Sequence, residues 1–113
     1  MLIIRGSLRE LKPQIAAILE IVDEEFEAVG CETTVLTSGW RKFKKGSLHH
    51  GYAADFDSQQ MPEDINDVKW QSLKVRLRER LGGEYDVVVH ATPRAHAHVE
   101  FDPPSMKNES VVA

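Results

Sequence analysis

The segment at positions 46–57 reads Gly-Ser-Leu-His-His-Gly-Tyr-Ala-Ala-Asp-Phe-Asp. It combines two imidazoles and two carboxylates with small residues that allow backbone segments to approach closely. Imidazole beside carboxylate is the ligand chemistry of zinc and similar divalent ions. We therefore interpret this segment as one half of a metal site.

A second segment near the end of the chain alternates polar and apolar residues, His96-Ala97-His98-Val99-Glu100-Phe101. In a strand, this period of two puts the three polar residues on one face and the three apolar residues on the other. The same test places Asp55 and Asp57 on one face of a strand. If the two strands are neighbours in one sheet, a loop histidine, an aspartate and a second histidine converge into a three-ligand site.

The length, net charge and cysteine content limit the classes of protein to which this chain could belong. At 113 residues we expect one domain over residues 1–104 and a frayed tail at 105–113 that lacks any pattern. The net charge of -4 argues against nucleic acid as a partner, and the basic run at 41–45 is too short to reverse that. The single cysteine, Cys31, excludes an internal disulfide.

The apolar start of the chain is interrupted at Arg5. It is too short for the apolar region of a signal peptide or for a membrane span. We therefore expect cytoplasmic synthesis without a signal peptide, and no membrane insertion.

Apolar periodicity predicts two helices. The first starts at about Pro13, which suits the first helical position, and ends at Gly30. The second starts at Pro62 with acidic residues in its first turn and ends at Gly82-Gly83. The core-facing stripe of the first helix consists of Ile15, Ile18, Leu19, Val22 and Phe26.

The strands complete the expected fold. A β-branched run at Thr33–Thr37 predicts one strand, and Tyr85–His90 predicts another. The turn at Thr92–Arg94 should join the latter to the His96 strand as a hairpin. The order helix, strand, strand, helix, hairpin predicts an α+β domain with a small, mainly antiparallel sheet and two helices.

Several motifs occur in a recognisable order: Thr37-Ser38-Gly39, Gly46-Ser47-Leu48-His49 with Gly51, Ala53 and Asp55, then Tyr85-Asp86-Val87-Val88 and His96-Ala97-His98-Val99-Glu100-Phe101-Asp102-Pro103. Together they resemble the zinc D-alanyl-D-alanine peptidases. More closely, they resemble small phage-borne members related to phage L-alanyl-D-glutamate endopeptidases and to the Hedgehog amino-terminal domain. The resemblance covers roughly Pro13 to Pro103, and its specificity comes from two separated motifs in the right order.

The resemblance implies a Hedgehog-like peptidase fold with zinc as its cofactor. The implied zinc ligands are His49, Asp55 and His98. His96 would stabilise the transition state, and Arg41 and Ser47 would hold carboxylate or carbonyl oxygens of the substrate.

The activity implied by the resemblance is hydrolysis of bacterial peptidoglycan stem peptides, of the D,D-carboxypeptidase or endolysin type. The substrate peptide would be the partner of a monomeric enzyme. A chain without an export signal would reach the periplasm or cell wall through a membrane pore during phage lysis.

The metal motif departs from the family pattern in its spacing. The family has two residues between the motif histidine and glycine, whereas only His50 separates His49 from Gly51. The match from Ser47 onward favours His49 as the ligand, with His50 as the substitute.

The second departure concerns the general base. The family places an acidic residue three positions before the last zinc histidine, and Ala95 occupies that position. A carboxylate base typically contributes a factor of about 10² to 10⁴ in rate, so activity should be weak without a replacement. The candidate replacements are Glu100, Asp57 and His90. For Glu100, which shares a strand face with His98, and for Asp57, we favour a role in orienting a ligand over catalysis. The alternative reading is a catalytically idle metal-binding domain of a phage or prophage accessory protein.

Overall fold

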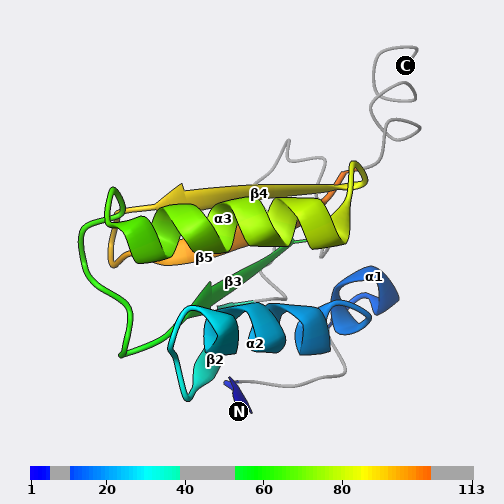
Figure 1. The fold of residues 1–113 in the computed structure, drawn as a ribbon. Coiled ribbons are helices and arrows are strands. Elements are labelled where there is room, and N and C mark those ends of the chain that lie inside the picture. Colours follow the sequence, from blue (N-terminus) through cyan, green and yellow to red (C-terminus); the bar gives the residue numbers. More distant parts are fainter. Residues whose placement is uncertain (6–10, 39–52, 103–113) are drawn as a thin grey trace.

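Five strands form one mixed sheet in the computed structural model, which describes residues 1–5, 11–38 and 53–102 (Figure 1). The strands are β1 (Leu2–Ile4), β2 (Thr34–Ser38), β3 (Ala53–Asp57), β4 (Tyr85–His90) and β5 (His96–Phe101). Their order across the sheet is β1-β2-β3-β5-β4. β1 runs parallel to β2, and the other three pairings are antiparallel. The predicted α+β class and the hairpin of β4 and β5 are confirmed.

β1 is a strand that the sequence pattern did not predict. Its three residues pair with Thr34, Val35 and Leu36 of β2. A three-residue apolar run is too short to show a period of two, and its partner strand lies about thirty positions further along the chain. Pairing with a distant strand therefore decides this element.

The first predicted helix is divided into α1 (Pro13–Ala16) and α2 (Leu19–Ala28). At the break, the backbone N–H of Ile18 donates to the carbonyl of Ile15, three residues back, at 3.1 Å. This tighter turn interrupts the α-helical ladder, yet Ile15 and Ile18 are both buried. Gly30 follows α2 with a φ of 100°, a conformation that glycine adopts without steric cost.

The second predicted helix is α3 (Val68–Leu81), which starts six residues later than expected. The Asp67 side chain caps it by accepting a hydrogen bond from the Lys69 backbone N–H at 2.9 Å. Pro62 lies outside the helix, where its carbonyl accepts a hydrogen bond from Trp70 Nε1 at 2.6 Å. Across the described residues, no helix is long and apolar enough to span a membrane.

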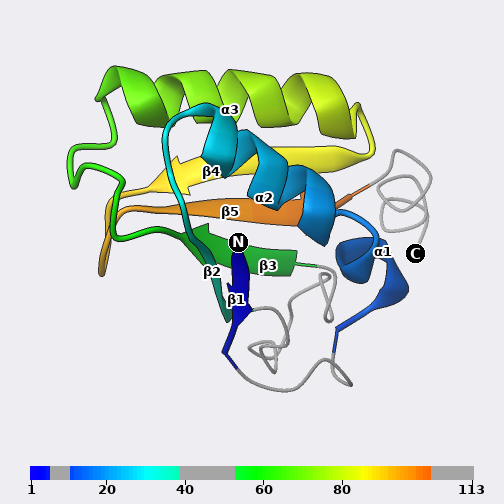
Figure 2. The same cartoon turned by 60° about the horizontal axis from the view of Figure 1, so that its bottom comes forward.

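The core lies between the sheet and the helices α2 and α3, which cover the same face of the sheet (Figure 2). Phe26 of α2 and Trp70 of α3 meet edge to face, with ring centroids 6.2 Å apart. The buried strand residues that face these helices include Leu36, Ala54, Phe56, Val87, Ala97 and Val99. Because side chains alternate along each strand, the polar residues of β3 and β5 project from the opposite face.

Polar contacts join the two helices and attach α3 to the sheet. Glu25 of α2 is only 4% exposed and accepts hydrogen bonds from Arg76 and Arg80 of α3. The Arg78 guanidinium donates to the Val87 carbonyl of β4, at 3.2 Å from Nε and 2.9 Å from Nη2. These charge-assisted contacts orient α3 along the outer strand of the sheet.

We expect Trp70→Ala to lower the free energy of unfolding by about 3–5 kcal/mol. The substitution empties a fully buried site and leaves the Pro62 carbonyl without its indole donor. Urea unfolding followed by circular dichroism measures the change. Val68→Ala is the matched control on the same helix, because Val68 is 76% exposed and its truncation should leave the free energy of unfolding nearly unchanged. Equal losses in both variants would contradict this description of the core.

Candidate metal centre

Asp55 and His98 face each other across the central strand pair of the sheet. β3 and β5 are antiparallel neighbours, and the Cα partner of Asp55 is His98. On the opposite face of the same two strands, Ala54 pairs with Val99 inside the core. The two strands are thus neighbours in one sheet, the condition on which the expected site depends, and burial of their apolar face places both polar side chains on the other face.

The His98 ring is held between two carboxylates. Its Nδ1 lies 2.6 Å from Asp55 Oδ1, and its Nε2 lies 2.6 Å from Glu100 Oε1. Glu100 reaches the ring because it is two residues further along β5 and projects from the same face. Asp55 is 7% exposed, so its contact with His98 is largely shielded from water.

These two contacts change the protonation of His98. The hydrogen bond to Asp55 is the main cause of a raised His98 pKa, and the contact with Glu100 raises it further. Burial acts in the opposite direction but is outweighed. The two carboxylates therefore stabilise the protonated ring relative to a free histidine, because an imidazolium can donate to both of them.

His96 lies beside this pair on the same face of β5. Its Nδ1 lies 2.7 Å from the backbone carbonyl of Arg94. Because a carbonyl only accepts, Nδ1 carries the proton and donates it there. Its Nε2 lies 3.9 Å from Asp55 Oδ1. The predicted transition-state stabiliser is therefore close to the predicted ligand Asp55.

His90 of β4 joins the group from the neighbouring strand. Its ring centroid lies 5.4 Å from that of His96 and 5.6 Å from that of His98. The register explains this position, because His90 is the Cα partner of His96. The sequence identified His90 as a candidate base, but its place beside the other two histidines depends on the β4–β5 pairing.

A register irregularity in β2 lies next to Asp55. Leu36 pairs with Phe56 and Ser38 pairs with Asp55, so the register shifts at Thr37. The Thr37 hydroxyl donates to the Asp55 backbone carbonyl at 3.3 Å. Bulges of this kind are frequent beside functional sites, where they redirect a strand.

The remaining predicted site residues lie outside the described part of the chain. These are Arg41, Ser47, His49 and the substitute ligand His50. The expected tail at 105–113 and the residues 103 and 104 before it also lie outside. The structure thus describes two of the three predicted ligands, together with His96.

Zinc fits the donor chemistry of Asp55 and His98, because carboxylate oxygen and imidazole nitrogen are common zinc ligands. Two ligand atoms on one tetrahedral zinc lie roughly 3.3 Å apart, given bonds of about 2.0–2.2 Å. The 2.6 Å between Asp55 Oδ1 and His98 Nδ1 is a hydrogen-bond distance. Asp55 Oδ1 and His98 Nδ1 would therefore hold zinc in place of the proton that they share in this structure.

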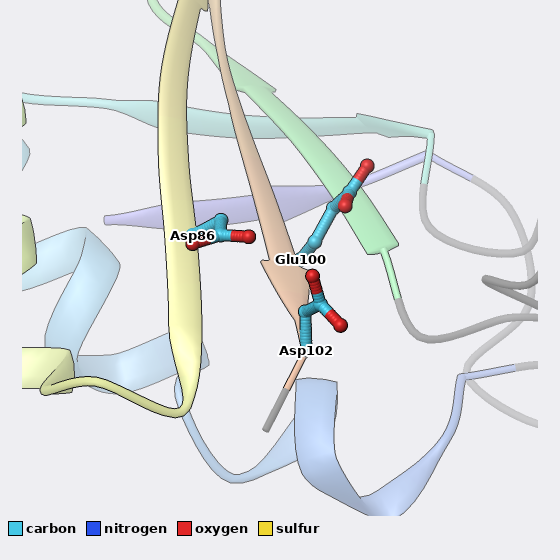
Figure 3. A group of neighbouring side chains, drawn as sticks. All are labelled: Asp86, Glu100 and Asp102. Carbon is cyan, nitrogen blue, oxygen red and sulfur yellow. The ribbon is translucent and has the colours of Figure 1, made fainter. Parts of the chain in front are cut away.

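An acidic group at the end of β5 was not predicted. It consists of Asp86, Glu100 and Asp102, and one carboxylate oxygen from each lies within 4.8 Å of the others (Figure 3). Asp86 comes from β4, where it is the Cα partner of Glu100. Carboxylates alone suit hard cations such as magnesium or calcium better than zinc, and Asp86 is exposed. The alternation of polar and apolar residues along β5 marks Glu100 as a residue of the polar face, but only the β4–β5 register brings Asp86 next to it.

No protein-family model, curated protein or solved structure matches this chain.

The raised pKa of His98 predicts a pH-dependent stability in the metal-free protein. The unfolded histidine titrates near pH 6.5, so the folded state retains the His98 proton to higher pH than the unfolded chain does. This stabilisation is complete below about pH 6.5 and is lost as pH rises through the folded pKa. We expect the excess stability of the wild type over His98→Gln to shrink across that window.

Urea unfolding of the two proteins with a chelator present, at a series of pH values above and below this window, measures the difference. A difference that stays constant or grows with pH would contradict the assignment of the proton to His98.

Proposed function

We propose that this chain is a zinc-dependent peptidase that hydrolyses peptide bonds in bacterial peptidoglycan stem peptides. The observation that carries the proposal is the meeting of Asp55 Oδ1 and His98 Nδ1 across paired strands. These are two of the ligands implied by the resemblance to D-alanyl-D-alanine peptidases. His49, or His50 in its place, would complete the ligand set.

The described residues have distinct parts in the proposed reaction. Asp55 and His98 would hold the ion, and bound zinc would supply a Lewis acid that polarises the scissile carbonyl. His96 would donate from Nε2 to the developing oxyanion. Since its Nδ1 already donates to the Arg94 carbonyl, His96 can do so only while both ring nitrogens carry protons.

Other parts of the proposal follow from the resemblance. Arg41 and Ser47 would anchor carboxylate or carbonyl oxygens of the stem peptide. The sheet would correspond to the Hedgehog-like peptidase fold, and the protein would act as a monomer. Its site of action would be the periplasm or cell wall during phage lysis.

One observation favours a second function, a catalytically idle metal-binding domain of a phage or prophage accessory protein. Ala95 stands where the family places its acidic base, and it is a buried member of the core. Glu100 is engaged by the His98 ring. Asp57 accepts a hydrogen bond from the Ser58 backbone N–H at 2.6 Å and lies 3.9 Å from Arg94. An active peptidase would have to take its general base from one of these engaged groups or from His90, whereas an idle domain needs none.

The first test of the proposal is metal content and digestion of cell-wall sacculi. We expect wild-type protein purified without chelator to contain zinc and to release peptide fragments from purified sacculi. Asp55→Ala and His98→Ala should lose both properties, because each removes a ligand atom. Elemental analysis and chromatography of the released fragments are the measurements.

Asp86→Asn is the matched control, since it neutralises a carboxylate on the outer strand β4 without touching the two predicted ligands. It should retain zinc and activity. Zinc retained by the wild type without any cleavage would support the idle domain instead. Zinc lost by Asp86→Asn and retained by Asp55→Ala would move the site to the acidic group and contradict the proposal.

We expect His96→Ala to retain zinc and to lower kcat by about 10²–10³-fold, the usual effect of removing one oxyanion donor. KM should change much less, because this hydrogen bond strengthens mainly in the transition state. Steady-state kinetics on a synthetic stem peptide measure both constants. An unchanged kcat would remove His96 from the mechanism.

A further inference from the structure

Both ring nitrogens of His98 have a partner, and the two partners have different origins. Asp55 approaches Nδ1 from the neighbouring strand β3, whereas Glu100 approaches Nε2 from the same strand as the histidine. Within the described residues, these two carboxylates are the groups that hydrogen-bond the ring. The Glu100 side chain is 22% exposed, so the contact is partly shielded from water.

The contact with Glu100 decides which nitrogen can bind a metal. An imidazole can coordinate through either nitrogen, and the hydrogen bond made by the other nitrogen fixes the choice. An ionised carboxylate only accepts hydrogen bonds, so Nε2 must carry a proton when it faces Glu100. Nδ1 needs a proton for the same reason while it faces Asp55, so a ring that donates to both carboxylates is an imidazolium. If zinc binds Asp55 and takes the place of the Nδ1 proton, the contact with Glu100 retains the proton on Nε2, and Nδ1 is the nitrogen left to coordinate.

We infer that Glu100 is a positioning residue that holds the Nε2 proton of His98 and so presents Nδ1 to the metal beside Asp55. This inference rests on the proposed function, because it takes His98 as a zinc ligand. The Glu100 carboxylate also limits rotation of the ring about its Cβ–Cγ bond. Loss of this carboxylate would leave both nitrogens available and the ring less well oriented.

Asp86 offers a control for the charge of Glu100. The two residues are Cα partners on adjacent strands, and their carboxylates belong to the same acidic group. Both would attract a cation by long-range electrostatics, but only Glu100 contacts the His98 ring. Comparing the two residues therefore separates the effect of the hydrogen bond from the effect of negative charge.

The test is a zinc titration of the full chain against a chromophoric chelator, with the wild type and the variants Glu100→Ala, Glu100→Gln and Asp86→Asn. We expect Glu100→Ala to bind zinc about 10 to 100-fold more weakly, the usual range for loss of a group that orients a ligand. Glu100→Gln retains an oxygen acceptor at the same place and should recover most of the affinity. Asp86→Asn should bind zinc nearly as tightly as the wild type.

A second readout reports the ring itself. Long-range proton–nitrogen correlation spectra of the zinc-bound, ¹⁵N-labelled proteins distinguish a protonated nitrogen from a metal-bound one. The wild type and Glu100→Gln should show His98 bound through Nδ1 and protonated at Nε2. Glu100→Ala should show Nε2 coordination or a mixture of the two arrangements. Thermal unfolding of each metal-free variant establishes that the protein is folded.

The outcomes separate this inference from the proposed function. Zinc binding by the wild type with no loss in Glu100→Ala would overturn the inference alone. Equal losses in Glu100→Ala, Glu100→Gln and Asp86→Asn would also overturn it, because charge would then explain the effect. If Glu100→Ala does not fold, Glu100→Gln carries the test. The inference would be overturned if Glu100→Gln bound zinc as tightly as the wild type but through Nε2 of His98. A wild-type chain that binds no zinc overturns both.

Discussion

The register between β3 and β5 is the constraint on which the candidate site depends. Ala54 and Phe56 of β3 lie in the core with Val99 and Ala97 of β5, and this burial specifies which residues pair. A slip of one residue would turn the apolar side chains of one strand outward and lose their burial. The same register necessarily places Asp55 opposite His98. The packing of one face therefore holds the polar groups of the other face together.

The rest of the fold supports this strand pair from one side. The helices α2 and α3 are joined by the Phe26–Trp70 contact and by the buried Glu25 with its two arginines. Arg78 attaches α3 to β4, the strand that flanks β5. Groups on a paired and packed sheet are held more accurately than groups on a loop. Asp55, His96 and His98 share this support.

The polar face combines two opposing electrostatic requirements. The carboxylates of Asp55 and Glu100 favour a positive charge on His98, which raises its pKa, whereas metal binding requires the loss of the Nδ1 proton. A divalent ion would replace that proton with a larger positive charge between the same groups. The same carboxylates that stabilise the imidazolium thus favour a cation in its place. In the proposed peptidase, Ala95 in place of the family's acidic residue would affect catalysis rather than this binding chemistry.

Local patterns in the chain were enough to predict the strands at 53–57 and 96–101, the faces that they present and the glycines that end the helices. Alternation and helix-ending chemistry are properties of neighbouring residues, so they can be read without knowing the fold. The start of α3 at Val68, the break after Ala16 and the strand β1 were not predicted. β1 depends on pairing with the distant β2, whereas the Asp67 cap and the Ile18–Ile15 hydrogen bond are local contacts that apolar periodicity does not reveal. The contact of Glu100 with His98, the approach of His90 and the meeting of Asp86 with Glu100 depend on side-chain placement and strand register. The first contact joins residues two apart on β5 and depends on how their side chains are placed. The other two require the particular β4–β5 register, which the prediction of a hairpin does not specify, so the packed sheet decides them.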